Sequence, residues 1–346
     1  MGSEGTHTAA AGGPLRTPAE LAEGVRGGNR RALSRLISWA ENDQPGFAEA
    51  LGAFYGDVGR AWRIGVTGPP GAGKSTLVNE LALALRQDER DLDVGILAVD
   101  PSSPFTGGAL LGDRIRMDEL TADPKVYIRS MASRKSHGGM ARAGVDACDV
   151  MDAFGIDRIM IETVGVGQAE YDVMAACDTV IVVMCPGAGD GIQAMKAGIL
   201  EVADVLVVNK SDRPGADRLY DDLVEAVHVR DGRATADDGW TVPVVRAAAG
   251  RGEGADDVLT AVAAHRERLE QLGLANVRNQ KRTAQVRRIV EEALERRVFA
   301  QADMNAAIAA QLAEGHTAYA VADSLLGEVT VSLSAQVTKL SPDAKP

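Results

Sequence analysis

The sequence predicts an α/β fold in which helices cover both faces of a doubly wound, mostly parallel sheet, with helical extensions at the N- and C-terminal ends. Two observations predict this fold. Short apolar runs of strand length alternate with segments of helical periodicity through the middle of the chain. A glycine-rich turn also follows the first apolar run and opens a helix, which is the local order of a phosphate-binding α/β protein.

The expected strands follow one another through the middle of the chain. They are Ile64–Thr67, Val94–Val99, Val126–Arg129, Arg158–Glu162, Thr179–Met184, Val205–Val208 and Val242–Val245. Segments with the apolar spacing of a helix lie between them, beginning with Thr76–Arg86. Because these strands are apolar throughout, we expect both faces of the sheet to be buried.

The chain divides into four expected parts, which are residues 1–17, 18–60, 61–264 and 265–346. The first is small and polar, and we expect a disordered tail. The second should be a helical arm, because apolar residues recur at helical spacings on both sides of Gly27-Gly28. The third contains the strands and all the motifs described below. The fourth has charge-rich periodic segments and is expected to be helical.

The composition of the chain indicates which class of partner it binds and in which compartment it occurs. A net charge of -12 over 346 residues argues against a nucleic-acid or anionic-membrane surface, which would need a basic face. No apolar run approaches the roughly 20 residues that span a bilayer. Cys148, Cys177 and Cys185 lie in apolar stretches, where buried reduced thiols are expected. The sequence therefore predicts a cytoplasmic protein whose partner is a protein or a small molecule.

The first chemical motif is Gly68-Pro69-Pro70-Gly71-Ala72-Gly73-Lys74-Ser75, which matches the P-loop pattern G-x-x-x-x-G-K-[ST]. Its backbone N–H groups and the N-terminus of the following helix would face phosphates. Lys74 would contact the β and γ phosphates, Ser75 would ligate Mg²⁺, and Thr76 would lie near the α phosphate. The motif predicts a P-loop nucleoside triphosphatase that uses Mg²⁺.

The second motif is Asn209-Lys210-Ser211-Asp212, which follows an apolar strand as a base-reading loop should. Asp212 can accept hydrogen bonds from the N1–H and the exocyclic amine of guanine, and adenine offers neither donor in that arrangement. Backbone groups of Ala248 and Ala249 are expected to contact the guanine oxygen. The two motifs in this order predict a GTPase whose nucleotides are GTP and GDP.

Between the two motifs, three acidic residues could complete a Mg²⁺ site. Glu162 ends an apolar strand where P-loop proteins place the acid that orients the metal, and the N–H of Gly165 could meet the γ phosphate. Asp100 and Asp113 are also available to the metal. From the residues alone, Asp100 could instead cap a helix and Asp113 could be a solvated loop charge.

The chain resembles one family, the methylmalonyl-CoA mutase-associated GTPases, also called the MeaB or ArgK type. The segments that carry the resemblance are Gly28–Leu33, Leu97–Ser103, Thr106–Met117, Glu162–Gln168 and Pro186–Asp190. The resemblance covers the chain from about Leu21 to about Leu272. It implies a SIMIBI-type G domain and a GTP-hydrolysing chaperone that gates adenosylcobalamin loading and protects an adenosylcobalamin-dependent acyl-CoA mutase. It also implies a homodimer formed through the C-terminal helices.

The resemblance further implies roles for particular residues. Asp100, Asp113 and Glu162 would lie in the Mg²⁺ and switch region. Residues Asp190, Gln193 and Lys196 would form a further switch that couples the nucleotide state to the partner. From the residues alone, they could instead lie in a surface loop leading into a helix.

Hydrolysis is expected to be slow in the isolated protein. Directly after the switch glycine, where Ras-like proteins have a glutamine that orients the attacking water, this chain has Val166. An apolar side chain cannot hold a water molecule by a hydrogen bond. We therefore expect a partner to accelerate hydrolysis by placing Lys196, Arg114 or Arg134 near the γ phosphate.

Three alternatives stay open at this stage. The segment from Glu162 to Gly165 would suit the switch of a nickel-type metallocentre-assembly GTPase. Such a protein would also need soft or imidazole ligands for the metal. A P-loop kinase would transfer phosphate to a small acceptor, although the guanine motif is unusual for one. A nucleotide-dependent binding module whose hydrolysis is incidental would keep both motifs without using the switch.

Overall fold

The computed structural model describes residues 17–88, 90–101, 118–133, 139–163, 174, 177–187, 199–231, 239–299 and 304–327. The chain separates into two compact units, Met1–Lys281 and Arg282–Pro346. The first unit contains the sheet and both nucleotide motifs. The part of the second unit that the structure describes is helical.

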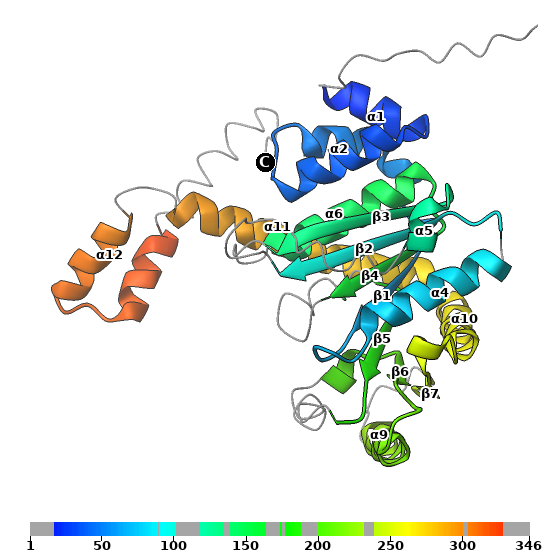
Figure 1. Cartoon of the computed structure of the whole chain (residues 1–346). Coiled ribbons are helices and arrows are strands. Elements are labelled where there is room, and N and C mark those ends of the chain that lie inside the picture. The colour runs from blue at the N-terminus through cyan, green and yellow to red at the C-terminus, as the bar shows by residue number, and fades with distance from the viewer. Residues whose placement is uncertain are drawn as a thin grey trace, which may run out of the picture. The chain divides into compact units, whose positions relative to one another are not determined.

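One sheet of seven strands organises the first unit (Figure 1). Its strands are β1 Trp62–Thr67, β2 Val94–Pro101, β3 Val126–Ser133, β4 Arg158–Thr163, β5 Thr179–Met184, β6 Val205–Val208 and β7 Val244–Arg246. Their order is β3-β2-β4-β1-β5-β6-β7, and every neighbouring pair is parallel. The predicted doubly wound parallel sheet is confirmed. Strand β7 begins later than expected, after Pro243, which has no N–H to donate to a ladder.

The helices agree with the predicted periodicity. They are α1 Pro18–Arg26, α2 Arg30–Glu41, α3 Phe47–Phe54, α4 Lys74–Asp88, α5 Asp118–Ala122, α6 Gly139–Phe154, α9 Ala216–Asp231, α10 Ala255–Leu272, α11 Leu274–Phe299 and α12 Met304–Ala313. The break between α1 and α2 has a local cause. Gly28 has a φ of 72°, and the side chain of Asn29 caps α2 by accepting the N–H groups of Arg31 and Ala32. None of the helices in the described ranges is long and apolar enough to cross a membrane.

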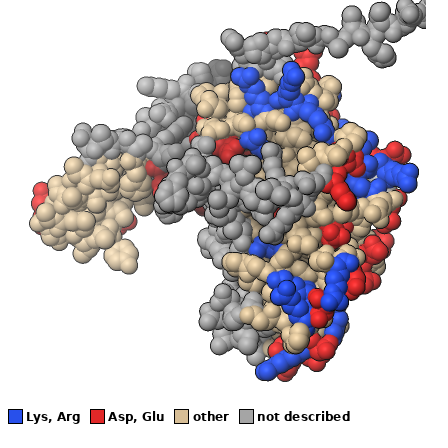
Figure 2. Space-filling view, in the orientation of Figure 1, with Lys and Arg blue, Asp and Glu red and all other residues tan. Residues whose placement is uncertain are grey.

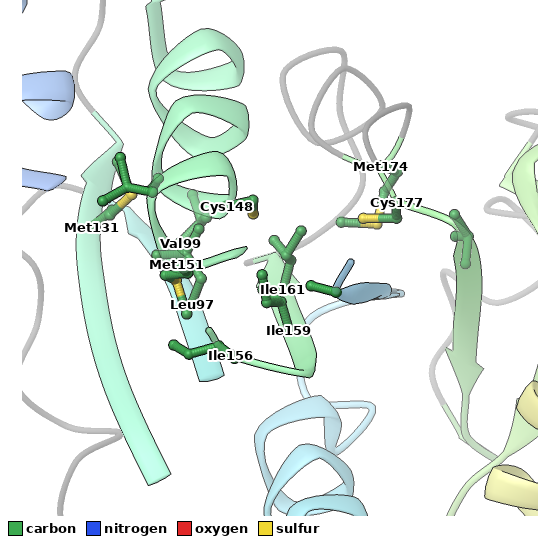
Figure 3. Packing of buried hydrophobic residues seen from close by; sticks show 14 of the residues in the cluster. Leu97, Val99, Met131, Cys148, Met151, Ile156, Ile159, Ile161, Met174 and Cys177 are labelled. Atoms are coloured by element: carbon green, nitrogen blue, oxygen red, sulfur yellow. The ribbon is translucent and has the colours of Figure 1, made fainter. Parts of the chain in front are cut away.

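Neighbouring residues of each strand pack into opposite layers. In β4, Ile159 and Ile161 belong to the cluster that α1, α2, α3 and α6 complete, whereas Met160 belongs to the cluster completed by α4 and α10. Figure 3 shows the first cluster, where Cys148 and Met151 of α6 lie near strand residues of β2 and β4. Both faces of the sheet are therefore buried, which explains the unbroken apolar strands.

Charged side chains of both signs are interspersed over much of the face shown in Figure 2, and basic side chains gather over the N-terminal arm. The exposed arginines of α2 are Arg30, Arg31 and Arg35. Positive and negative side chains are thus unevenly distributed over this face.

A buried ion cluster occupies the amino ends of the central strands. Arg63 of β1 donates to Asp149 at 2.7 Å and to Asp152 at 2.9 Å, both on α6. The Asp152 carboxylate also accepts three consecutive backbone N–H groups, of residues 59–61, at 2.9 to 3.0 Å. Burial alone would lower the pKa of the Arg63 guanidinium, but the negative charges of Asp149 and Asp152 outweigh burial and raise that pKa above its ordinary value.

Polar contacts made by Arg278 and Thr179 secure the same edge. Arg278 of α11 donates to both carboxylate oxygens of Asp178, at 2.9 and 2.8 Å, just before β5. Trp62 Nε1 donates to Thr179 Oγ1 at 3.2 Å, and that hydroxyl lies 2.9 Å from His265 Nδ1. These contacts hold α10 and the first turns of α11 to the ends of β1 and β5.

Candidate functional site

The P-loop joins β1 to α4 and depends on its glycines. Gly68 has a φ of 141°, and a Cβ there would lie 2.1 Å from the carbonyl oxygen of Val183 in β5. Only glycine allows the chain to turn this close to the neighbouring strand. The loop is therefore fixed in position by the sheet itself.

Lys74 begins α4 and is folded back over this loop. Its ammonium donates to the carbonyl oxygens of Gly68 at 2.9 Å and Pro69 at 3.2 Å, and the residue is only 7% exposed. A phosphate is a stronger, charged acceptor than a carbonyl. This arrangement can deliver a buried positive charge to phosphates that enter the loop.

Ser75 and Glu162 meet beside the loop. Ser75 Oγ donates to Glu162 Oε1 at 2.5 Å, and Glu162 lies in register with Val66 near the end of β1. Hydroxyl and carboxylate oxygens are the hard donors that Mg²⁺ prefers. The two residues expected to serve the metal thus lie together, and their chemistry fits Mg²⁺.

Asn209, after β6, links the P-loop to the base-reading loop. Its Nδ2 donates to the carbonyl oxygen of Ala72 at 2.9 Å, and its Oδ1 accepts the N–H groups of Lys210 at 2.9 Å and Ala249 at 3.1 Å. Gly73, with a φ of 92°, leaves room for this amide, since a Cβ there would lie 2.4 Å from Nδ2. Sequence reasoning placed Asn209 at the nucleotide but did not foresee that it connects three loops.

The base-reading residues lie on two loops that bond to each other. Between the loops, Ser211 N–H donates to the carbonyl oxygen of Ala247 at 3.0 Å. Within the second loop, Ala248 N–H donates to the carbonyl oxygen of Glu253 at 3.0 Å. Asp212 Oδ2 lies 3.1 Å from a guanidinium nitrogen of Arg251. Arg251 was missed from the sequence, although a charged residue directly after Ala248-Ala249-Gly250 was a visible signal.

The described site residues gather at one edge of the sheet. They are Gly68, Pro69, Pro70, Gly71, Ala72, Gly73, Lys74, Ser75, Thr76, Glu162, Asn209, Lys210, Asp212, Ala248 and Ala249, which follow or end β1, β4, β6 and β7. Because neighbouring parallel strands end at the same edge, the loops that carry these residues lie together there.

Several expected residues lie outside the described residues. They are Asp113, Gly165, Asp190, Gln193 and Lys196, together with Arg114, Arg134 and Val166. The backbone of Asp100 belongs to β2, but its side chain also lies outside the described part. Within the described ranges, no group of three or more His, Cys, Asp or Glu side chains is arranged to hold a metal ion.

Comparisons with known proteins place this geometry among GTPases. The family model described as Methylmalonyl Co-A mutase-associated GTPase MeaB matches residues 33–303. A protein of Pyrococcus abyssi named as a GTPase is 47% identical over 263 residues, which cover 76% of this chain and 80% of the relative. GTPase ArgK of Escherichia coli is 33% identical over 300 residues, or 84% and 88% of the two chains. The crystal structure of LAO/AO transport system kinase matches with a TM-score of 0.68 and 27% identity, covering 90% of this chain and 97% of that one.

Proposed function

The chain belongs to the methylmalonyl Co-A mutase-associated GTPase MeaB family, and from this premise we propose that it is the chaperone of an adenosylcobalamin-dependent acyl-CoA mutase. The chain is a P-loop GTPase, and its sheet is consistent with the SIMIBI-type fold. The proposed role is to gate the loading of adenosylcobalamin into the mutase and to protect the mutase from inactivation. The family match over residues 33–303 carries this proposal.

In the proposed reaction, Lys74 exchanges the P-loop carbonyls for the β and γ phosphates of GTP. Ser75 and Glu162 would hold Mg²⁺, and the bound metal would neutralise charge on the phosphates. Asp100 and Asp113 are further candidates for its ligand shell, and the N–H of Gly165 would meet the γ phosphate. Asp212 would accept the guanine donors while Asn209 keeps the base loop and the P-loop together.

The proposed switch limits hydrolysis until the partner binds. With Val166 after the switch glycine, the isolated chain would not orient the attacking water well. Asp190, Gln193 and Lys196 would couple the nucleotide to the mutase, and Lys196 would complete the charge around the γ phosphate. The buried thiols of Cys148, Cys177 and Cys185 support a cytoplasmic location for this cycle.

We also propose that residues 265–346 form a homodimer. In α11 an apolar face is exposed at helical spacing, with Val286 at 60%, Ile289 at 38% and Val290 at 50%. Leu312 of α12 is exposed at 45%. Apolar helix faces of this kind are usually covered by a partner, and light scattering would measure the oligomeric state.

The test of the mutase-chaperone role uses Lys74→Ala and the mutase. For the wild-type chain, we expect GTP hydrolysis to rise at least about tenfold when the mutase is added, because the partner completes the catalytic charges. Lys74→Ala should weaken GTP binding by about 100-fold, since a buried charge-assisted contact to phosphate is lost, and should abolish nucleotide control of adenosylcobalamin transfer. The matched control Lys125→Ala, an exposed lysine far along the sequence from the loop, should behave as wild type. A hydrolysis rate that the mutase leaves unchanged would contradict the chaperone role while leaving the GTPase assignment intact.

The same assay separates the alternatives. A P-loop kinase would leave a phosphorylated acceptor in place of free phosphate. A nickel-type metallocentre-assembly GTPase would bind Ni²⁺ by thiolate or imidazole ligands, which equilibrium dialysis with Ni²⁺ would measure.

A further inference from the structure

Asp212, the residue expected to read guanine, already has a charged neighbour. A guanidinium nitrogen of Arg251 lies 3.1 Å from its Oδ2. The Asp212 side chain is 24% exposed and that of Arg251 is 60% exposed, so the pair lies at the outer side of the base loop. Among the described residues, Arg251 is the side chain that forms an ion pair with this carboxylate.

The position before Ala249 explains why such a neighbour matters. Many GTPases have serine or threonine where this chain has Ala248, and a hydroxyl there could hold the reading carboxylate. Ala248 is buried at 2% exposure and has no donor in its side chain. In the part of the chain that the structure describes, Arg251 has a side-chain donor group within ion-pair distance of the Asp212 carboxylate.

The backbone holds Arg251 where it can supply that donor. Ala248 and Glu253 exchange backbone hydrogen bonds at 3.0 and 3.3 Å, and Arg251 N–H donates to the carbonyl oxygen of Ala248 at 2.7 Å. Gly252, with a φ of 72°, closes the turn. This closed loop is tied to the Asp212 loop by the bond from Ser211 N–H to the carbonyl oxygen of Ala247.

The ion pair leaves acceptor capacity for the base. A carboxylate has two oxygens with about four acceptor positions, and the guanidinium nitrogen of Arg251 that lies 3.1 Å from Oδ2 can occupy one of them. The N1–H and exocyclic amine of guanine can therefore bond to the remaining positions. Building on the guanine reading by Asp212, we propose that Arg251 is a positioning residue that orients this carboxylate in place of the missing hydroxyl at position 248.

The test compares GDP with inosine diphosphate, which lacks the exocyclic amine. Arg251→Ala should weaken GDP binding by about two- to fivefold, as expected for loss of a partly exposed ion pair. Binding of inosine diphosphate should weaken less, because it forms one bond fewer to Asp212. Titration calorimetry would thus show a lower preference for GDP over inosine diphosphate, which a general loss of structure would not produce.

Three further variants make the test specific. Ala248→Ser in the Arg251→Ala background should restore the preference, because it returns the hydroxyl. Arg251→Lys should retain part of it, because charge remains but the planar fork is lost. Arg246→Ala, which removes a nearby exposed ion pair with Asp217, should leave it unchanged.

The outcomes separate this role from the proposed function. If wild-type protein prefers GDP to ADP but Arg251→Ala leaves GDP affinity and the preference unchanged, the positioning role is wrong. Tighter GDP binding by Arg251→Ala would also overturn it, because Arg251 would then compete with the base. A wild-type protein with no preference for GDP over ADP would overturn guanine reading by Asp212 and this role with it.

Discussion

At the amino ends of the strands, Arg63 is enclosed between two carboxylates, whereas at the carboxyl ends Lys74 and Lys210 donate to backbone carbonyls of the P-loop. Lys210 Nζ lies 2.6 Å from the carbonyl oxygen of Gly71. Carboxylates accept from the arginine within the fold, whereas phosphate oxygens could replace the P-loop carbonyls as acceptors for the two lysines. The amino edge therefore uses its buried arginine to hold the fold together, whereas the lysines of the carboxyl edge contact the loop that the motif assigns to phosphate binding.

The largest expected effect is on the amino edge. Arg63→Met should lower the free energy of unfolding by about 3–5 kcal/mol, because Asp149 and Asp152 would be left buried without their counter-charge. Urea unfolding monitored by circular dichroism would measure this change. GDP affinity of the folded variant should stay within about twofold of wild type, a change below about 0.4 kcal/mol.

Arg60→Met is the matched control for that variant. The Arg60 side chain is 74% exposed and pairs with Asp57 at 2.9 Å, so its loss should cost less than about 1 kcal/mol. Equal losses of stability for the Arg63 and Arg60 variants would show that burial does not distinguish the two pairs. A large loss of GDP affinity in Arg63→Met would show that the two edges are coupled.

The apolar pattern was sufficient to predict the sheet, but not the cluster at its amino edge. The first strand was expected to start at Ile64, because a charged residue normally marks the boundary of a buried strand. In the structure β1 begins at Trp62 and includes Arg63. Its partners Asp149 and Asp152 are far away in the sequence and sit on a helix, where acids are usually solvated. No local pattern reports such a pairing.

The site shows the same limit. The P-loop and base motifs could be predicted because each is a continuous run whose backbone geometry depends on its own residues. The contact between Asn209 and the P-loop, and that between Asp212 and Arg251, join segments from different strands. Such contacts depend on strand order, which short motifs do not encode. The positions of the motifs were therefore easier to predict than the interactions between them.

A second prediction concerns the connection across the carboxyl edge. Gly71→Ala and Gly73→Ala both force alanine into a positive φ, of 75° and 92°, at a cost of about 1–2 kcal/mol each. A Cβ at Gly71 would meet no atom within 4 Å, whereas one at Gly73 would displace the Asn209 amide. Gly73→Ala should therefore cost about 1 kcal/mol more, the net value of a hydrogen bond. Urea unfolding of the nucleotide-free variants would measure the difference.

Asn209→Ala tests whether that difference arises from the amide. In its background, alanine at position 73 no longer meets Nδ2, so the two glycine variants should become equally costly. A difference that persists without Asn209 would mean that the backbone at position 73 is strained for another reason.

The smallest effect is expected at the rim of the amino edge. Arg86 donates to Asp123 at 2.8 Å and, with the backbone N–H of Lys125, lowers the pKa of Asp123. A lowered folded pKa stabilises the protein above the unfolded pKa, and this contribution is lost as pH falls through the folded value. Asp123→Asn should therefore cost less than about 1 kcal/mol at pH 7 for this partly exposed pair, and the cost should shrink below a pH of about 4. Urea unfolding at pH 7 and below a pH of about 4 would measure this cost in free energy of unfolding.

An Arg86→Met background provides the control. If Arg86 is the main cause, the cost of Asp123→Asn at pH 7 should fall in that background. A cost independent of both pH and Arg86 would exclude the ion pair as its source.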